Sequence, residues 1–286
     1  MALWFREEAS PGHRLEWKVR RVLHSGRSAY QEITVVETED FGPTLALDGI
    51  VQTTAKDEFI YHEMMALVPL TAHPAPERVL IIGGGDGGLA REVLRCPWVR
   101  EVTLVEIDPE VVEVSKRFLP GHAVSFADPR LTVRFQDGAR YLEELPAGEA
   151  FDVILVDSTD PEGEGPGRTL YAPPFRRQVL RALREGGLFV QQTGTPFYNP
   201  DTVREVSQDS LAVFPVVRVY WCVVPTYPGG LFTFLAAGRG TDPSQPRRPV
   251  TWETRWYSEA VHRASFVLPP LLADLVPRVV QVAQQR

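Results

Sequence analysis

The sequence contains no long apolar run and no excess of positive charge. Its longest uninterrupted apolar stretch, residues 266–273, contains two prolines and is far shorter than the roughly 20 residues that a membrane helix needs. The 37 acidic residues outnumber the 30 lysines and arginines, which leaves a formal net charge of −7, whereas nucleic-acid-binding proteins normally carry a basic excess or stripe. We therefore expect neither a membrane nor a nucleic acid as partner, and cationic ligands suit the negative charge better.

Cysteine is also scarce, and the residues near the N-terminus are charged. The two cysteines, Cys96 and Cys222, are too few for a disulfide framework or a metal cluster, so we expect them to be small buried side chains. Arg6, Glu7 and Glu8 stand where a signal peptide would be apolar. We expect the protein to stay in the cytoplasm.

The 286 residues suffice for one large domain, or for a large and a small one. Four early segments alternate polar and apolar residues or carry β-branched ones: residues 16–23, 31–37, 44–47 and 50–54. Asp48-Gly49 is a hairpin signal between the last two, so these segments predict a small antiparallel β domain. A helical spacing follows over residues 57–67; we expect this helix to end at Pro69, with residues 69–76 as a linker.

From Arg78 onward, strand-like apolar runs alternate with helical patterns. The runs are residues 79–82, 102–105, 131–135, 153–156 and 188–190, and the helical patterns lie near 88–95, 109–119, 139–145 and 174–184. This alternation predicts an α/β fold with a parallel sheet covered on both faces, and the runs 216–224 and 231–237 fit a closing hairpin at the sheet edge. We therefore predict a Rossmann-like domain over residues 71–286, preceded over residues 1–70 by the β domain and its linking helix.

A glycine-rich loop, Gly83-Gly-Gly-Asp-Gly-Gly88, follows the first of these strands and opens a helix. It satisfies the G-x-G-x-x-G pattern in the expected context, and Glu106 lies twenty residues beyond Asp86 at the end of the next strand. We expect a nucleoside to lie across this sheet edge, with Glu106 accepting hydrogen bonds from both ribose hydroxyls. Alternatively, the glycine loop is only a tight turn and binds no nucleoside.

The charge of Asp86 narrows the choice of nucleoside. A dinucleotide would place its pyrophosphate against this loop, where a carboxylate works against it. The carboxylate of S-adenosylmethionine would also face Asp86, at a cost of about 4 kcal/mol for like charges about 4 Å apart at an effective dielectric near 20. Decarboxylated S-adenosylmethionine offers an ammonium instead, so the sign of the charge favours it. Alternatively, Asp86 points to solvent or caps the helix.

Three further acids follow the carboxyl ends of two neighbouring strands. Asp157-Ser-Thr-Asp-Pro161 comes after the strand at 153–156, and Asp137-Gly138 comes after the strand that ends at Phe135. Ligands of open α/β sheets bind outside these strand ends, so we expect the acids to face the same crevice as the glycine loop. Each of them alone could instead cap a helix or a turn.

Seven motifs make the chain resemble the polyamine aminopropyltransferases, specifically the bacterial spermidine synthases, over nearly its whole length. They are LDGIVQTT (47–54), DEFIYHEMM (57–65), the glycine loop, VEID (105–108), DSTDP (157–161), PTYPGG (225–230) and VHRASFVLP (261–269). The resemblance implies a Rossmann-like, methyltransferase-type domain behind a small antiparallel β domain. It also implies no cofactor besides the co-substrate, polyamine and nucleoside substrates, and a homodimer or homotetramer.

By this resemblance Asp157 is the general base, and Asp160 helps to hold the attacking diamine. The residues implied to contact the nucleoside are Gln31, Gly83, Gly85, Asp86 (on the aminopropyl ammonium), Glu106 (on the ribose), Asp137 (on the adenine amino group) and Gly138. The residues implied to line or anchor the substrate tails are Gln52, Tyr61, His62, Ser158, Thr159, Pro166 and Tyr227. A zinc helix would need a second histidine at position 66, which is Ala, so we expect no metal at His62.

One stretch departs from the family pattern. The loop at residues 162–169 is slightly longer than usual and carries Arg168, which we expect to be solvated. Its glycines and proline suit a mobile lid.

The resemblance implies a reaction: decarboxylated S-adenosylmethionine plus putrescine gives spermidine, 5′-methylthioadenosine and a proton. Agmatine, cadaverine or a longer polyamine are alternative acceptors. Outside this class, the alternatives are an S-adenosylmethionine methyltransferase and a non-catalytic polyamine-binding relative.

Overall fold

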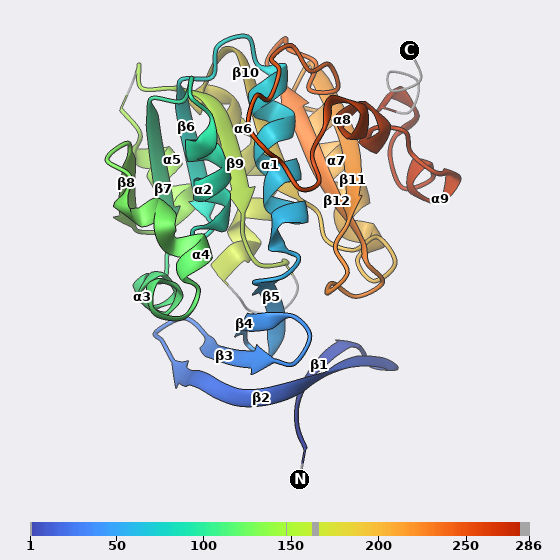
Figure 1. Ribbon diagram of the computed structural model, residues 1–286. Coiled ribbons are helices and arrows are strands. Elements are labelled where there is room, and N and C mark those ends of the chain that lie inside the picture. Colours follow the sequence, from blue (N-terminus) through green and yellow to red (C-terminus); the bar gives the residue numbers. More distant parts are fainter. Residues whose placement is uncertain (1, 147, 162–165, 281–286) are drawn as a thin grey trace.

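The structure is a computed structural model that describes residues 2–146, 148–161 and 166–280. Two sheets organise this part of the chain, one of five strands and one of seven. Figure 1 shows the smaller sheet lying below the larger one, with the helices arranged around the larger sheet.

The smaller sheet is antiparallel throughout, with its strands in sequence order. The strands are β1 (Leu3–Ser10), β2 (His13–Arg27), β3 (Glu32–Thr38), β4 (Gly42–Leu47) and β5 (Ile50–Thr54). The last four confirm the predicted strands, whereas the sequence did not predict β1. In β1 the apolar Leu3 and Trp4 are exposed and Glu7 is buried, which reverses the usual pattern of a strand packed on a core.

The larger sheet has a parallel centre and an antiparallel edge. Its strands are β6 (Arg78–Gly83), β7 (Glu101–Glu106), β8 (Leu131–Phe135), β9 (Phe151–Asp157), β10 (Leu183–Gln192), β11 (Val216–Val223) and β12 (Leu231–Gly238). They lie in the order β11-β12-β10-β9-β6-β7-β8, and β6 to β10 pair in parallel. The hairpin of β11 and β12 closes the β10 edge, and the predicted α/β Rossmann-like fold class is confirmed.

Helices cover both faces of the larger sheet. They are α1 (Glu58–Ala72), α2 (Gly88–Arg95), α3 (Pro109–Phe118), α4 (Pro120–Ala123), α5 (Gly138–Glu144), α6 (Pro173–Ala182), α7 (Pro200–Leu211), α8 (Glu259–Ser265), α9 (Pro270–Ala273) and the 3-10 helices η1 (Val124–Ala127) and η2 (Pro166–Tyr171). In Figure 1, α1 and α2 lie in front of the sheet and α5, α6 and α7 lie behind it, each set contributing to a separate buried apolar cluster. No helix in the described part of the chain is both long and apolar enough to cross a bilayer.

Helix α1 continues through Pro69, so the predicted helix end is wrong. The helix runs to Ala72, and the connection to β6 shrinks to residues 73–77. Proline cannot donate to the carbonyl group of Met65, which costs about 3 kcal/mol in a helix interior. The neighbouring Val68 and Leu70 are completely buried against the sheet, and each such side chain contributes about 1.5–3 kcal/mol. Burial therefore outweighs the proline.

Glu63 fastens α1 to the C-terminal part of the chain. Its buried carboxylate accepts hydrogen bonds from the backbone N–H groups of Arg255, Trp256 and Tyr257 at 2.7–2.8 Å. These three donors lie in a segment without helix or strand, so the carboxylate replaces the partners that regular structure would provide.

We expect Glu63→Ala to lower the free energy of unfolding by about 3 kcal/mol or more, because it leaves several backbone donors without an acceptor. Urea unfolding at a fixed protomer concentration measures the change. Glu113→Ala is the control: it removes an exposed ion pair with Lys116 and should cost less than about 1 kcal/mol. Equal losses in the two variants would contradict the anchoring role of Glu63.

Candidate active site

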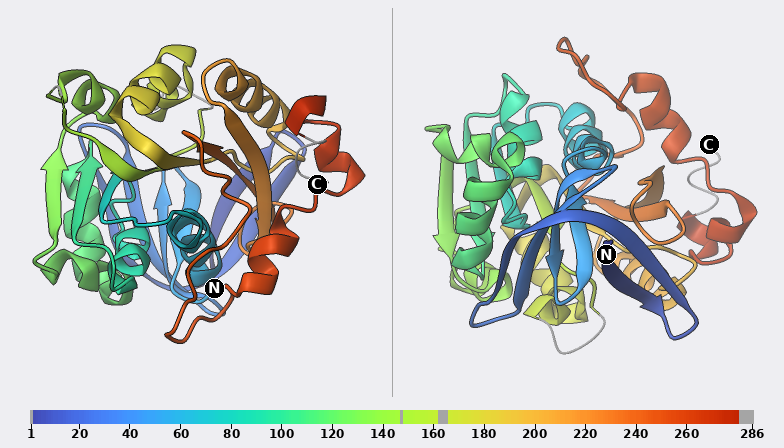
Figure 2. Two further views of the ribbon diagram at one scale, coloured as in Figure 1. Left: turned by 90° about the horizontal axis from the view of Figure 1, so that it is seen from above. Right: turned by 60° about the horizontal axis from the view of Figure 1, so that its bottom comes forward.

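A cavity of about 420 Å³ lies between the two sheets, where the carboxyl ends of the parallel strands face the smaller sheet. Figure 2 shows the blue strands of the smaller sheet lying across this end of the larger one. The predicted site residues that line the cavity are Gln31, Gln52, Tyr61, His62, Gly83, Gly85, Asp86, Glu106, Asp137, Gly138, Asp157, Ser158, Thr159, Asp160 and Tyr227. Pro166 begins η2, and residues 162–165 of the predicted lid lie outside the described residues.

The glycine loop lets the ends of β6 and β9 approach closely. Gly83 and Gly84 have positive φ angles of 83° and 69°. A Cβ atom on Gly83 would lie 2.1 Å from the carbonyl oxygen of Asp157, and the N–H of Gly84 donates to that oxygen at 2.9 Å. Glycine satisfies both requirements, so the loop brings Asp86 close to Asp157.

Glu106 and Gln31 line the cavity together and are both hydrogen-bonded to Asp108. The N–H of Asp108 donates to Glu106 Oε1 at 2.9 Å, and Asp108 Oδ2 accepts from Gln31 Nε2 at 2.9 Å. Burial raises the pKa of Glu106 to about 7, although the Asp108 N–H favours its ionised form. Sequence reasoning missed Asp108, because an acid before Pro109 signals only the N-cap that it also provides for α3.

Asp137 serves both as a cap and as a cavity residue. Its Oδ1 accepts from the N–H of Arg140 at 2.8 Å and caps α5, as the alternative reading of this acid proposed. It also lines the cavity beside Gly138, where a Cβ atom would lie 2.2 Å from the side chain of Ile82. A carboxylate has two oxygens, so capping leaves one of them for a ligand.

Asp157 lines the cavity and is hydrogen-bonded to Tyr61. The Tyr61 hydroxyl donates to Asp157 Oδ1 at 2.6 Å. Burial raises the pKa of Asp157 to about 6, and the positive charge of His62 limits this rise. A carboxyl group with this pKa is ionised at neutral pH and still accepts a proton, as a general base must.

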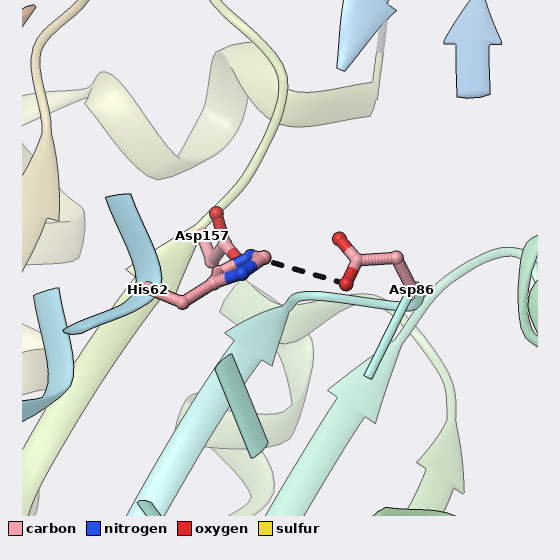
Figure 3. A group of neighbouring side chains, drawn as sticks. All are labelled: His62, Asp86 and Asp157. Carbon is pink, nitrogen blue, oxygen red and sulfur yellow. Dashed lines mark ion pairs between the residues drawn. The ribbon is translucent and has the colours of Figure 1, made fainter. Parts of the chain in front are cut away.

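Asp86 lies close to His62 and Asp157, and Figure 3 shows the His62 ring pointing toward its carboxylate. Its Oδ1 accepts from the N–H of Gly88 at 2.6 Å, so Asp86 bonds to the start of α2 while it lines the cavity. The same oxygen lies 3.9 Å from His62 Nε2. Capping through Oδ1 leaves Oδ2 for a cationic ligand.

The three side chains in Figure 3 also have the spacing of a metal site, since one ligand atom from each lies within 4.8 Å of the others. The charge on His62 opposes this interpretation. Burial lowers the pKa of His62, but the charge of Asp86 and the hydrogen bond to Glu58 outweigh it and raise the pKa to about 9. An imidazole protonated on both nitrogens has no lone pair for a metal ion.

Asp160, Gln192 and Glu7 also line the cavity. Asp160 Oδ1 accepts from Gln192 Nε2 at 2.8 Å, and burial raises the pKa of Asp160. Glu7 comes from β1, is 2% exposed, and has no partner for Oε2 among the described residues. Burial raises its pKa to about 7. The sequence did not identify Glu7 or Gln192 as site residues. Glu7 lies on a strand that the sequence did not predict, so no alternating pattern marked its side chain as facing the cavity.

An aromatic wall joins the two sheets beside these acids. The Tyr227 hydroxyl donates to the carbonyl oxygen of Gln52 at 2.7 Å, and the Tyr227 and Tyr61 rings meet nearly edge-on with centroids 6.1 Å apart. Ser158 and Thr159 continue from β9 along the cavity. The carbonyl oxygen of Ser158 accepts from Gln192 Nε2 at 2.9 Å.

Comparisons with known proteins point to the same family over nearly the whole chain. Residues 58–244 match the family model described as the spermine/spermidine synthase domain, and residues 3–55 match the spermidine synthase tetramerisation domain. Curated relatives called polyamine aminopropyltransferase include those of Desulforudis audaxviator, 44% identical, and Bacillus subtilis, 42% identical, each over 96% of this chain and 99% of the relative.

A solved crystal structure is similar over almost the whole molecule. It is a spermidine synthase in complex with the transition state analogue AdoDATO, with a TM-score of 0.92 and 40% sequence identity over 96% of this chain and 94% of that one. The chain therefore belongs to the spermine/spermidine synthase family and is a polyamine aminopropyltransferase.

Proposed function

We propose that the protein is a spermidine synthase, which transfers the aminopropyl group of decarboxylated S-adenosylmethionine to putrescine. The observation that carries this proposal is the set of carboxylates around one cavity: Glu7, Asp86, Glu106, Asp157 and Asp160. A cavity lined by acids favours positively charged ligands. Both substrates meet that condition, the donor with a sulfonium and an ammonium and the acceptor with two amines.

The donor binds with its nucleoside against Glu106 and its tail toward Asp86. Glu106 accepts from the ribose hydroxyls, and Gln31 and Asp137 lie beside the nucleoside. Asp86 uses Oδ1 to cap α2, so Oδ2 receives the aminopropyl ammonium. Intact S-adenosylmethionine would bring a carboxylate to this position and is disfavoured by like-charge repulsion.

The acceptor lies between Asp157 at one end and Asp160 and Glu7 at the other. Its attacking amine is next to Asp157, and its second ammonium is near Asp160 and Glu7. Burial raises the pKa of Glu7, and the negative charge of Asp160 adds a smaller increase. A cation placed beside Glu7 and Asp160 would therefore stabilise the ionised form of both carboxylates. This second anionic position supports a diamine acceptor.

The chemical step needs a neutral amine. An amine with a pKa near 10.4 is mostly protonated at pH 7, and freeing its lone pair costs roughly 4–5 kcal/mol. The nearby sulfonium lowers that pKa, and Asp157 takes the proton, a contribution of ~10²–10⁴ in rate. The nitrogen then attacks the carbon next to sulfur in line, and neutral 5′-methylthioadenosine leaves. We propose that no metal or cofactor takes part, because the leaving group needs no further charge stabilisation.

Product analysis tests the proposal against its alternatives. The purified protein is incubated with decarboxylated S-adenosylmethionine and, separately, putrescine, agmatine, cadaverine or spermidine, and product masses are read. Spermidine from putrescine supports the proposal, and preference for another amine would reassign the acceptor. Methyl transfer from intact S-adenosylmethionine would indicate a methyltransferase, and no thioether release would indicate a non-catalytic relative.

Asp157→Asn should lower kcat by about 10²–10⁴, because the amide cannot accept the proton. The affinity for 5′-methylthioadenosine, measured by calorimetry, should change little, since this ligand has no amine to deprotonate. Asp160→Asn is the matched variant and should raise the KM for putrescine more than it lowers kcat. Unchanged turnover in Asp157→Asn would rule out this base.

Asp86→Asn should weaken binding of the decarboxylated donor roughly tenfold to a thousandfold, since it removes one ion pair. Asparagine still caps α2, and 5′-methylthioadenosine, which lacks the ammonium, should keep its affinity. Asp48→Asn is the control, because Asp48 also lines the cavity and holds a turn through a bond from the Glu32 N–H. Equal loss for the two nucleosides would refute the role of Asp86.

Binding of 5′-methylthioadenosine should strengthen as pH rises through about 7, where the buried Glu106 ionises. The ribose hydroxyls donate to the ionised form, so below that pH the affinity should fall by up to about tenfold per pH unit. Calorimetric titration between about pH 5.5 and 8.5 measures this. Glu106→Gln should bind weakly at every pH; a pH dependence that survives in this variant belongs to another group.

We further propose a homodimer or homotetramer formed through the smaller sheet, which matches the family's tetramerisation domain. The cytoplasmic location expected from the sequence stays a prediction.

A further inference from the structure

His62 is the one cationic side chain among the described residues around the cavity. Its side chain is 3% exposed, and Nδ1 lies 2.5 Å from Glu58 Oε2. The opposite nitrogen, Nε2, lies 3.9 Å from Asp86. The imidazole thus has a buried carboxylate behind it and the acids of the cavity in front of it.

The position of the ring is fixed by close packing. A Cβ atom on Gly88 would lie 2.3 Å from His62 Cε1 and 2.5 Å from Nδ1, so the last glycine of the loop provides the space for this ring. The rings of Tyr61 and His122 meet it edge-on, with centroids 5.4 Å and 6.0 Å away. The ring therefore presents one constant edge to the cavity.

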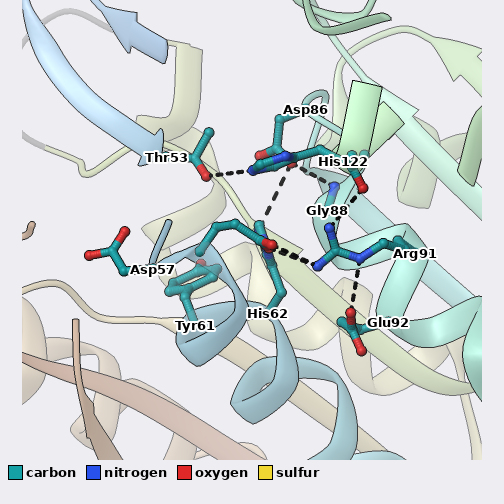
Figure 4. Close-up of polar contacts among 12 residues, drawn as sticks. Thr53, Asp57, Tyr61, His62, Asp86, Gly88, Arg91, Glu92 and His122 are labelled. Atoms are coloured by element: carbon teal, nitrogen blue, oxygen red, sulfur yellow. Dashed lines mark hydrogen bonds and ion pairs between the residues drawn. The ribbon is translucent and has the colours of Figure 1, made fainter. Parts of the chain in front are cut away.

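Glu58 is itself held by Arg91 on α2, in the cluster that Figure 4 shows around His62. Arg91 Nη2 donates to both carboxylate oxygens of Glu58, at 3.0 Å and 2.8 Å. Other nitrogens of Arg91 donate to Glu92 and to the carbonyl oxygen of Gly121, both at 2.9 Å. Burial tends to raise the pKa of Glu58, but its bonds to His62 and Arg91 hold the pKa well below the usual range.

Only one of the two neighbouring imidazoles is placed to carry charge. His122 has a neutral partner, the Thr53 hydroxyl, at 3.1 Å from Nε2, and burial lowers its pKa. His62 has a carboxylate on each side. The titratable and charged groups that face His62 are Glu58 and Tyr61 on α1, Asp86 in the glycine loop, Arg91 on α2, His122 on α4 and Asp157 at the end of β9.

We propose that Glu58 and Arg91 are positioning residues for the reaction: Arg91 fixes Glu58, Glu58 fixes the His62 ring through Nδ1, and the ring supplies a positive charge to Asp86 and Asp157. This inference rests on the proposed role of Asp157 as the base. The charge of His62 lowers the pKa of Asp157, against the stronger effect of burial. Without it, the empty cavity would hold a larger fraction of protonated base.

The sign of the effect follows from these contacts. Glu58→Gln replaces the carboxylate beside His62 with a neutral amide, which can still accept a hydrogen bond but carries no negative charge, so the pKa of the ring falls. Wherever the ring is then neutral, Asp157 has lost a positive neighbour and its pKa rises above about 6. Since the base works only when ionised, the acidic limb of the kcat/KM profile, which reports the groups of the free enzyme, moves upward by on the order of one pH unit.

The experiment compares Glu58→Gln with Glu92→Gln. Glu92 is also buried and bonds to the same arginine, and none of its described bonds or ion pairs is to His62. The expected result is an upward shift of the acidic limb of kcat/KM in Glu58→Gln alone, with kcat/KM at about pH 9 within about twofold of the unchanged protein. A loss by the same factor at every pH, no shift, or an equal shift in Glu92→Gln would overturn the proposal.

A second measurement does not depend on turnover. Side-chain 1H–15N spectra of the histidines, with His62 assigned through His62→Gln, report the ring's charge between about pH 5 and 10. We expect His62 to be charged on both nitrogens at pH 7.5 and to titrate at least about two units lower in Glu58→Gln. A neutral His62 at pH 7.5 in the unchanged protein would overturn the inference, and it would do so whichever substrate the enzyme uses.

Discussion

The burial of several carboxylates along one sheet edge is the constraint on which the rest of the site depends. An ionised carboxylate away from water is unstable unless a cation or hydrogen-bond donors accompany it. Burial accordingly raises the pKa values of Glu7, Glu106 and Asp157. A ligand that brings positive charge or hydroxyl donors relieves this instability, so the empty cavity selects for such ligands before any shape complementarity is considered.

The same constraint explains why several acids perform two tasks. Asp86 and Asp137 each bond to a backbone N–H at the start of a helix and also line the cavity. From the sequence alone, helix capping and ligand binding were alternative roles for each of these acids, but a carboxylate has enough lone pairs for both. The caps also fix the rotamers of these side chains, so the acids meet a ligand already oriented.

Much of the fold and the acids at the strand ends could be predicted because β-α alternation fixes where strand ends gather, whereas Gln31, Gln52, Tyr61, His62 and Tyr227 were predicted only through the resemblance to the family. Once β6, β7 and β9 were recognised as parallel, the residues after them had to share an edge. The failures have local causes. Strand β1 exposes Leu3 and buries Glu7, the opposite of the pattern used to find strands, and Pro69 stays in α1 because tertiary burial exceeds a local preference. Neither cause is visible within a short window of sequence.

The smaller sheet forms part of the cavity wall beside Glu106 rather than a cover laid over it. Buried Asp108, at the start of α3, donates its N–H to Glu106 and accepts from Ser28 at 2.6 Å and Gln31 at 2.9 Å. Apolar residues of the smaller sheet, Ile33 among them, pack with others of α3 in a separate buried cluster. Separating the sheets would leave Asp108 Oδ2 without its two donors and Gln31 without its orienting partner. The arrangement of Glu106 and Gln31 in the cavity therefore requires both sheets to be docked, and it depends on Asp108, which does not line the cavity.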